Sequence, residues 1–479
     1  MLIFSVVILS TCVCWSEKIF GSWATILILL LICFSPIFLG NSCVILEDVP
    51  SAAVGLLAVY FFWRWLKKPE MLAAFIAGII LGFAELSKFT LLIFYPLFIL
   101  IWVLYRLPEL RTLSRRDFVA QIGQLVLLFA MSILIINMGY LFEDTGKQLG
   151  KFNFQTTLFT GCENLKDVPP SGRNRFENTL LGKIPVPLPA NFIQGIDTQR
   201  FDFERGLPSY LRGEWSQHGW WYYYLYALLL KLPLGVILLF GVAIYCTLFV
   251  REVNVSWRDE MVLILPGVVL LIFVSSQTGF SIHSRYVIPA LPFFFIWISK
   301  VGKLFLPQVP RSFKKRVLSI IVSILLAWSV MSSLSIYPHS ISYFNELAAI
   351  IPTPREPRCP SEPRDSSFIV SIIGAGSRNG GRHLHDSNID WGQDIFYLEK
   401  WCKNHPEVTS IHVFCFSSFP LDQTTIPLGK SNSEIDKLTG YIAISTNNLY
   451  DKENKFRRFL DIQPIARIGY SIYIYRVDE

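Results

Sequence analysis

Six polar residues at the borders of long apolar segments have the side chains needed to bind a phosphate group and act beside it. They are Glu47, Asp48, Lys88, His283, Arg285 and Tyr286. Guanidinium, ammonium and imidazole groups hold phosphate oxygens, and a phenol adds one donor. Carboxylates take a proton from an attacking hydroxyl or bind a divalent cation such as Mg²⁺ or Mn²⁺. A charge near the hydrocarbon region of a bilayer costs roughly 2.5–3.5 kcal/mol, so such groups usually have a partner or a function.

Each of the three stretches that carry these residues also has a simpler interpretation. Glu47-Asp48 could cap a helix that has Pro50 in its first turn. Lys88 and Arg285 could contact lipid headgroups, and Tyr286 could belong to the aromatic belt of a membrane protein. The functional interpretation depends on convergence, because the three stretches come from different apolar segments and combine acidic with basic groups.

The elements that position these residues are membrane helices. The chain is 52% hydrophobic, 15% aromatic and only 16% charged, with a mean hydropathy of +0.44, which excludes an ordinary soluble protein. Nine cysteines show no metal-ligand spacing and indicate no redox compartment. Ten apolar segments are expected to span the membrane, at about residues 2–15, 23–39, 49–66, 71–87, 89–105, 118–140, 219–249, 260–277, 287–306 and 317–337.

The distribution of basic residues predicts the orientation of these spans. Sixteen Lys and Arg residues fall in one set of alternate short loops, whereas the other set holds only Lys88 and Arg285. The basic side stays in the cytoplasm, so the three polar stretches and the C-terminal region are expected on the extracytoplasmic face. This orientation also places Met1 outside, and we therefore expect a first helix and its following loop to precede the present sequence.

The sequence divides into a membrane domain and a small C-terminal domain. We expect a polytopic all-α membrane domain over residues 1–340, with a long extracytoplasmic loop at about 141–218 that forms either a lid over a cleft or an irregular outer domain. Residues 341–368 are expected to be a linker, because 352–364 are rich in proline. Residues 369–479 are expected to form an extracytoplasmic α/β domain, with strands at 410–416, 440–445 and 465–475 and helices near 392–403 and 453–461.

The densest polar motif of the chain is His385-Asp-Ser-Asn-Ile-Asp-Trp-Gly-Gln-Asp394, directly ahead of an apolar pattern at Ile395, Leu398 and Trp401. Asp, Ser and Asn side chains cap helices, and the apolar spacing is helical, so the motif predicts at least a capped amphipathic helix. Local capping alone would explain this composition. Resemblance to a known family offers the alternative.

Several segments resemble the protein-mannosyltransferase-like branch of the GT-C superfamily, whose members take sugars from polyprenyl phosphate. These segments are residues 34–50, 84–90, 209–214, 219–223, 231–233, 283–292, 343–346, 385–394 and 468–471. The His-x-Arg-Tyr run at 283–286 and the motif at 385–394 are the most specific. The resemblance implies an integral, multi-pass membrane protein of the bacterial plasma (inner) membrane, with the lipid bilayer as its surroundings and no nucleic-acid partner.

The function that this resemblance implies is transfer of a hexosyl or pentosyl group from a polyprenyl-phosphate sugar to an extracytoplasmic acceptor, which is a protein, a lipid or a glycan. Asp48 and Glu47 would be catalytic and would hold a divalent cation if one is used. Lys88, His283, Arg285 and Tyr286 would bind the lipid phosphate. In one respect the sequence departs from the family, whose first outer loop carries the acidic residue taken as the catalytic base. That loop has no counterpart in the present sequence, so the activity of the chain as written depends on a segment that we expect upstream.

Two functions of another class remain open at this stage. The chain could be a non-catalytic scaffold that binds lipid phosphate and derives from the same family, or it could be a transporter. Transporters place polar groups near the bilayer midplane and show repeated halves. The sequence shows no repeat, and its polar residues lie at one edge of the apolar segments, so a scaffold agrees better with it than a transporter does.

Overall fold

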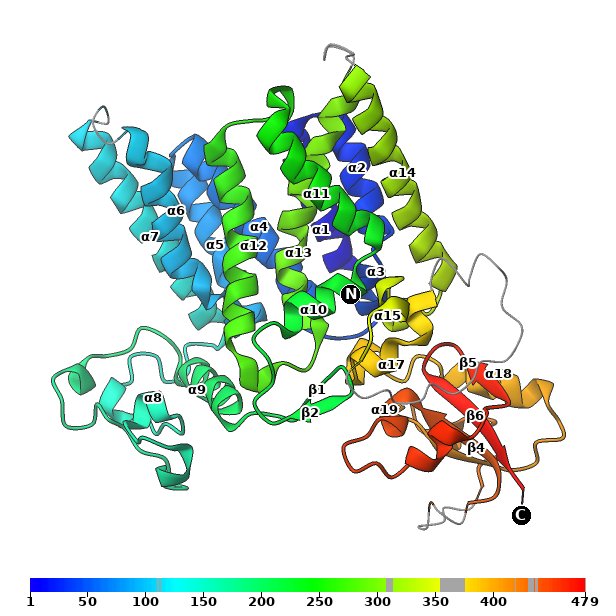
Figure 1. Ribbon diagram of the computed structural model, residues 1–479. Helices are drawn as coiled ribbons and strands as arrows, with labels where there is room; N and C mark the ends of the chain where they lie inside the picture. Colours follow the sequence, from blue (N-terminus) through cyan, green and yellow to red (C-terminus); the bar gives the residue numbers. More distant parts are fainter. Residues whose placement is uncertain are drawn as a thin grey trace.

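The computed structural model describes residues 1–109, 112, 114–306, 313–353, 375–417, 419–429, 435 and 438–478. Within these residues the fold is a bundle of apolar helices with two polar regions at one end (Figure 1). Seven helices are long and apolar enough to cross a membrane. They are Leu2–Phe20 (α1), Asp48–Lys67 (α4), Phe89–Glu109 (containing α6, Phe94–Arg106), Arg115–Gly139 (α7), Trp257–Ser276 (α12), Ser284–Phe305 (containing α13, Leu291–Ile298) and Phe313–Ile336 (α14).

Two bent pairs of helices bring this number to nine if each pair is one span. Ser22–Cys33 (α2) and Pro36–Ser42 (α3) meet at 57°, and Tyr223–Lys231 (α10) and Leu234–Phe249 (α11) meet at 109°. Both breaks lie beside a proline, Pro36 at the start of α3 and Pro233 just before α11, because proline cannot donate the next helical hydrogen bond. Each of the ten expected segments coincides with a helix or a bent pair. However, Met71–Ser87 (α5) has 17 residues and is shorter than the other spans.

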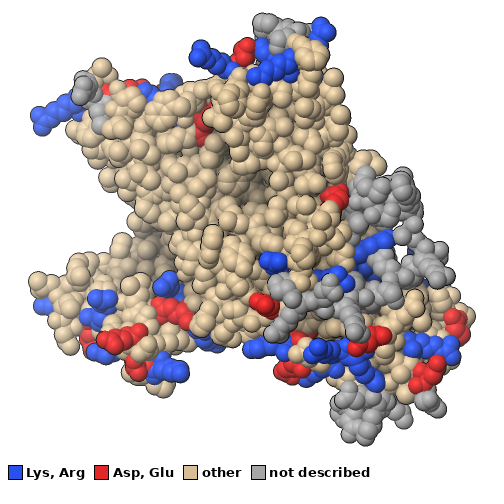
Figure 2. Space-filling model, in the orientation of Figure 1, with Lys and Arg blue, Asp and Glu red and all other residues tan. Residues whose placement is uncertain are grey.

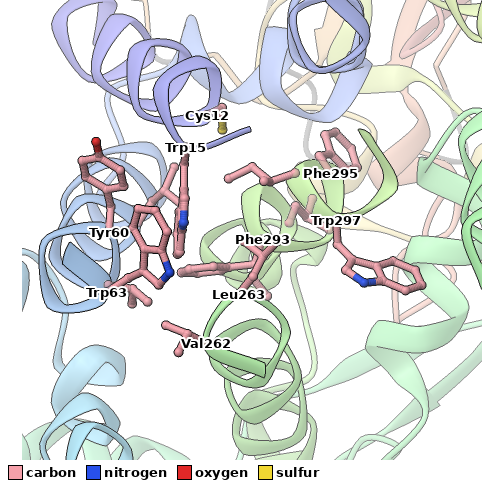
Figure 3. Close-up of a cluster of buried hydrophobic side chains, with 14 of the residues drawn as sticks. Cys12, Trp15, Tyr60, Trp63, Val262, Leu263, Phe293, Phe295 and Trp297 are labelled. Carbon is pink, nitrogen blue, oxygen red and sulfur yellow. The ribbon is translucent and has the colours of Figure 1, made fainter. Parts of the chain in front are cut away.

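Aromatic side chains pack helix α1 against helices α4 and α13 (Figure 3). The ring of Trp15 on α1 lies 5.8 Å from Tyr60 and 5.9 Å from Trp63 on α4, and 6.3 Å from Phe293 on α13. All four rings are buried. Such edge-on and tilted ring pairs contribute about 0.5–1.5 kcal/mol each beyond the area that they bury. The cluster therefore fixes α4 against α13, the two helices from which the polar stretches at 47–48 and 283–286 extend.

Helix α5 packs unusually closely on α7 because it carries glycine at the contact. A Cβ atom added at Gly78 would lie 2.3 Å from the carbonyl oxygen of Leu128, and one at Gly82 would lie 2.5 Å from Cβ of Ile135. Small residues at such positions let two membrane helices approach each other. The close contact fixes the end of α5, where Lys88 follows.

Charged residues lie toward the two ends of the helical bundle, and the surface between them is mostly uncharged (Figure 2). One end has the ion pairs Lys67–Asp259 at 2.7 Å and Lys300–Glu260 at 2.8 Å. The opposite end carries Asp48, Lys88 and Arg285, together with the long outer segment and the C-terminal domain (Figure 1). All three polar stretches are thus at one end of the bundle, as the sequence predicts.

The long segment at about residues 141–218, called the outer segment after its expected location, contains Thr157–Thr160 (α8), Ala190–Arg205 (α9) and a hairpin of Ser209–Leu211 (β1) and Glu214–Ser216 (β2). The expected linker is partly ordered, since Leu347–Ile350 (α15) lies within it. Residues 354–368, with most of the proline-rich run, lie outside the described residues.

The C-terminal domain has a four-stranded sheet in the order β3-β4-β6-β5. Its strands are Ile411–Phe414 (β3), Gly440–Ser445 (β4), Ala466–Ile468 (β5) and Ile472–Val477 (β6), where β3 and β4 are parallel and the other pairs antiparallel. Its helices are Gly380–His383 (α17), Ile395–Asn404 (α18) and Thr446–Leu449 (α19). The strands expected at 410–416 and 440–445 are confirmed, and the one at 465–475 is a hairpin instead, because Gly469 adopts φ +54° and turns the chain. The helix expected at 453–461 is wrong, since only a 3-10 turn forms there, at Arg457–Asp461.

Candidate functional site

The buried carboxylate of Asp48 contacts a cation from each of the other two polar stretches. Asp48, the first residue of α4, is fully buried, and its Oδ1 accepts a hydrogen bond from Nζ of Lys88. Its other oxygen, Oδ2, lies 3.0 Å from Nε of Arg285. Removing charges from water is costly, and the attraction between close opposite charges offsets this cost. The three residues therefore form one charge cluster with a net positive charge, hereafter the cationic cluster.

Local backbone structure places the two cations of the cluster. Lys88 is extended, with φ −165°, between α5 and the 3-10 turn Phe89–Ile93, so its side chain points away from the axis of α5. Arg285 lies on the 3-10 turn Ser284–Ala290, which carries Pro289 and precedes α13. Glu47 is the exposed member of the acidic stretch: its side chain is 53% exposed, and its Oε1 lies 3.7 Å from Nζ of Lys88.

Aromatic rings cover the cations on two sides. Nζ of Lys88 lies 4.9 Å from the ring centre of Tyr286. The guanidinium carbon of Arg285 lies 5.4 Å from the Tyr286 ring and 5.0 Å from the ring of Trp391. A cation over a ring face gains about 0.5–2 kcal/mol, more as it is desolvated. The rings thus help to keep both cations in place.

The C-terminal motif reaches the same cluster. The hydroxyl of Ser387 accepts a hydrogen bond from Nη1 of Arg285, and its Oγ lies 2.9 Å from Nδ1 of His283. Oδ1 of the neighbouring Asp386 lies 3.7 Å from the same His283 nitrogen. Asp386 has φ +61°, a left-handed conformation that is uncommon for a residue other than glycine and that is found at functional sites.

Asn388 fastens the motif to the membrane domain. Its Oδ1 accepts from the backbone N–H of Ser284 at 2.8 Å, and its Nδ2 donates to the carbonyl of Ile282 at 2.9 Å. The buried Lys231 donates from Nζ to the carbonyl of Asn388 at 2.6 Å. These bonds hold the backbone on both sides of His283, so the C-terminal motif positions the His-x-Arg-Tyr run.

The prediction that side chains of the motif at 385–394 cap the following helix is wrong. Asp394 stands at the N-cap of α18 but makes no side-chain capping bond. Its Oδ1 lies 2.6 Å from Nδ1 of His339, and its Oδ2 accepts from the hydroxyl of Ser471 at 2.8 Å. The neighbouring Asp390 is also buried, and burial, with the nearby charge of Asp394, raises its pKa to about 7. Asp394 therefore links the C-terminal domain to His339 of the preceding segment, and its side chain does not cap α18.

A cavity opens beside the cationic cluster and leads to apolar surface. It has a volume of about 150 Å³, and Glu47, Lys88 and Tyr286 line one side of it. A second cavity of about 310 Å³ shares five of its lining residues, which are Thr90, Gln199, Phe203, Phe273 and Gln277. Its further lining is largely apolar and comes from the start of α6 and from α9. The two cavities thus lie side by side, and α9 supplies lining residues to both; together they are called the lipid groove hereafter.

The arrangement does not favour a metal ion on Asp48. Both carboxylate oxygens of Asp48 lie next to cationic groups, and a divalent cation there would meet the positive charges of Lys88 and Arg285. Among the residues that the structure describes, no three His, Cys, Asp or Glu side chains form a group able to hold a metal ion. Glu47 is the carboxylate of the pair that reaches the cavity.

All six residues singled out in the sequence lie in or beside the cluster. Sequence reasoning missed the contributions of Asp386, Ser387, Asn388 and Trp391. The motif at 385–394 stood out in the sequence because it is dense in polar residues. No pattern in the chain, however, indicated that its serine contacts an arginine from a distant membrane helix.

Comparison with known families gives one match. Residues 1–142 match the family of dolichyl-phosphate-mannose-protein mannosyltransferases. Comparison with curated proteins and with solved structures found no match. Glu47, Asp48 and Lys88 lie within the matched region, whereas His283, Arg285 and the C-terminal motif lie beyond it. The match supports a membrane glycosyltransferase that uses a lipid-linked sugar. The resemblance seen in the sequence is thus confirmed for the N-terminal membrane region, which is similar to the dolichyl-phosphate-mannose-protein mannosyltransferases.

Proposed function

We propose that this protein is an integral membrane glycosyltransferase that moves a sugar from a polyprenyl-phosphate carrier to an acceptor on the extracytoplasmic face. The observation that carries the proposal is the pairing of Lys88 and Arg285 with one buried carboxylate, next to a cavity that continues into apolar surface. A prenyl phosphate has the matching chemistry, because its headgroup is anionic and its tail is apolar.

The residues have distinct roles in this proposal. Lys88 and Arg285 hold the donor phosphate, and His283 and Tyr286 add hydrogen-bond donors around it. Asp48 acts by positioning the two cations, since its oxygens already face them. The prenyl chain lies in the lipid groove under α9, where Phe203 and Phe273 provide apolar contact.

Transfer exchanges one bond for another at the anomeric carbon. The acceptor oxygen forms a bond to this carbon, while the bond between the carbon and the phosphate oxygen breaks and its electron pair stays on the phosphate. Inversion through an oxocarbenium-like transition state is expected for the family. The cationic cluster stabilises the charge that develops on the departing phosphate. The exposed Glu47 can orient the acceptor hydroxyl or take up its proton.

The orientation of the protein and its compartment are part of the proposal. Basic residues concentrate in the short loops at the end of the bundle opposite to Asp48, with sixteen against two, which favours that end as cytoplasmic. The site, the outer segment and the C-terminal domain would then face outward from a bacterial plasma membrane, with about ten spans below them.

A non-catalytic scaffold that binds lipid phosphate is the second candidate. One observation favours it, which is that Asp48 is fully buried and engaged by cations, so it is not free to act on an acceptor. Turnover separates the two functions, because a scaffold binds the donor without releasing polyprenyl phosphate.

The test uses the full chain in lipid nanodiscs with a panel of polyprenyl-phosphate hexoses and pentoses. An enzyme transfers the sugar of one of these donors to an added acceptor or to water, and thereby releases polyprenyl phosphate. Arg285→Ala should abolish donor binding and release, and Arg285→Lys should restore them only in part, since an ammonium cannot reproduce the planar fork of a guanidinium. Arg64→Ala, at an exposed arginine in the last turn of α4 and far from the cluster, is the matched control. Binding of a donor without release would favour the scaffold, and full release by Arg285→Ala would exclude Arg285 from the site.

A further inference from the structure

A separate cavity lies between the β1–β2 hairpin of the outer segment and the C-terminal domain. Its volume is about 540 Å³, which is within the range of small-molecule sites. Residues of the hairpin, Tyr210 and Trp215, form one side. The segment after α19 forms the other, with Asp451, Lys452, Asn454 and Arg457. No residue of the cationic cluster lines it, and the function proposed above does not use it.

The hairpin side of this cavity is a fixed aromatic wall. The rings of Tyr210 and Trp215 meet edge to face at 5.3 Å. Nε1 of Trp215 donates to the carbonyl of Tyr450 at 3.3 Å, and the hydroxyl of Tyr210 donates to the carbonyl of Gly381 at 3.0 Å. Nε1 of Trp215 and the hydroxyl of Tyr210 are thus both hydrogen-bonded, and these bonds keep the two rings in place. Rings that are already ordered lose little entropy when a ligand binds.

An imidazole completes the wall from behind. The ring of His385 lies 4.9 Å from Trp215 and 5.3 Å from Tyr210. Burial lowers the pKa of His385, so its imidazole is neutral at pH 7 and the wall carries no charge.

The opposite side of the cavity is polar and of mixed charge. Asp451 brings a carboxylate, Asn454 an amide, and Lys452 and Arg457 bring cations. Asn454 adopts φ +57°, which is uncommon outside glycine and is found at binding sites. An aromatic wall facing hydrogen-bonding groups of both kinds suits a sugar, which stacks a C–H face on rings and offers hydroxyls as donors and acceptors. A hydrocarbon would leave the polar side unpaired, and a phosphate would meet the carboxylate of Asp451.

The cavity lies close to the cationic cluster. His385, which backs its aromatic wall, is followed by Asp386, whose Oδ1 is 3.7 Å from Nδ1 of His283. Asn447 on α19 binds both residues: its Oδ1 accepts from the N–H of Asp386 at 2.9 Å, and its carbonyl is 2.8 Å from Nε2 of His385. The aromatic wall and the proposed phosphate site are thus linked through two consecutive residues. His385 contacts the wall, and Asp386 contacts His283.

We propose that this cavity binds a saccharide and that this saccharide is the acceptor glycan of the transfer reaction. The identification as acceptor rests on the function proposed above, whereas saccharide binding does not. Trp215 stacks on one sugar unit while the buried Tyr210 holds its ring from the edge, and Asp451, Asn454 and Arg457 bind the hydroxyls of the sugar. The end of the glycan that accepts the new sugar extends past Asp386 toward the cationic cluster.

The experiment measures binding without any donor, so that its outcome is independent of turnover. Full-length protein in nanodiscs is applied to an array of neutral and acidic oligosaccharides of one to six units. The parent is expected to bind at least one of them, and Trp215→Ala should weaken this binding about tenfold or more, the effect of losing roughly 1.4 kcal/mol. Trp221→Ala, a change at a tryptophan that is 67% exposed and lies outside the cavity, should bind as the parent does.

A second variant covers the case in which Trp215→Ala fails to fold. Arg457→Gln changes an exposed side chain at the rim and should weaken binding about threefold to tenfold through loss of one hydrogen bond. Absence of any array binding by the parent would overturn the proposal, as would unchanged binding by a folded Trp215→Ala or by Arg457→Gln. Array binding together with absence of donor turnover would instead contradict the transferase function and leave the saccharide site standing.

Discussion

Nε of Arg285 lies 3.0 Å from Oδ2 of Asp48, although the arginine precedes α13 and the aspartate begins α4. The other oxygen of this carboxylate binds Lys88. One acid therefore contacts two cations, and the exposed Glu47 lies 3.7 Å from one of them, Lys88. Asp48 keeps the two cations close together, which is the arrangement that the proposed phosphate site requires.

Asp48→Asn should remove the counter-charge of two cations that are almost completely buried. We expect a loss of stability of about 3–5 kcal/mol, the usual cost of breaking a buried ion pair from one side, and a loss of sugar transfer by several powers of ten. Thermal unfolding and donor turnover of the purified protein measure these effects.

The matched control for Asp48→Asn is Asp259→Asn at the opposite end of the bundle. Asp259 is buried and accepts hydrogen bonds of 2.7 Å from Lys67 and from Trp63, so its loss also lowers stability. Donor binding by the folded fraction should nevertheless match the parent. If Asp48→Asn behaved like Asp259→Asn in donor binding and transfer, Asp48 would have no role in the site beyond folding.

Ser387→Ala should weaken donor binding about tenfold, because Ser387 links Arg285 to His283 and its loss frees both side chains. As a positioning residue it should raise KM for the donor more than it lowers kcat, and Ser387→Thr, which keeps the hydroxyl, should restore most of the affinity. Ser417→Ala, at a serine that binds only its own loop, serves as control. Parental donor affinity in Ser387→Ala would show that the C-terminal motif does not act on the cluster.

The stability of the protein should fall as the pH rises from about 4 to about 7. Burial raises the pKa of Asp390 to about 7 from an ordinary value of 3.8, so the folded protein retains a proton that the unfolded chain has released. The stabilisation from this proton is complete below the ordinary pKa and is lost as the pH passes through the raised one. Asp390→Asn should flatten this dependence in thermal unfolding from pH 4 to 8. An equal slope in the variant and the parent would assign the dependence to other groups.

Much of the membrane fold could be predicted from the sequence because the bilayer imposes a simple rule. A span needs a long apolar run, and each of the ten runs found in the chain became a helix or a bent pair. Tertiary detail was harder to predict. The bend before Leu234 depends on Pro233, whereas the close approach of α5 to α7 depends on its glycine contacts.

The residues of the candidate site that border the membrane helices could be predicted from the sequence, whereas those of the C-terminal motif could not. Lys88 and Arg285 stood out because they were rare charges on a face otherwise poor in basic residues. Ser387 and Asn388 did not, since serine and asparagine are ordinary loop residues. Their role depends on how the C-terminal domain packs on the bundle. Asp394 contacts His339 and does not cap α18 with its side chain. This contact could not be predicted for the same reason, because His339 comes from outside the C-terminal domain.

The C-terminal domain should lie outside the cytoplasm, because Lys and Arg concentrate in the short loops at the opposite end of the bundle. A reporter that is active only in the cytoplasm, fused after residue 479, should therefore be silent. The same reporter inserted between Leu107 and Arg115 should be active. Activity at the C-terminal fusion would reverse the orientation and place the cationic cluster at the cytoplasmic surface.

The position of the bound donor is the most direct test of the central claim that a prenyl-phosphate sugar is held between the cationic cluster and the lipid groove. A polyprenyl-phosphate hexose with a diazirine near the phosphate, cross-linked to the full-length protein in nanodiscs, locates it by mass spectrometry of the labelled peptides. We expect labels in Phe89–Ile93 and in residues 196–203 and 273–280, and we expect Arg285→Ala to remove them. Labels confined to the apolar cavity of about 330 Å³ among α10, α11, α12 and α13, or labels unchanged by Arg285→Ala, would contradict the account.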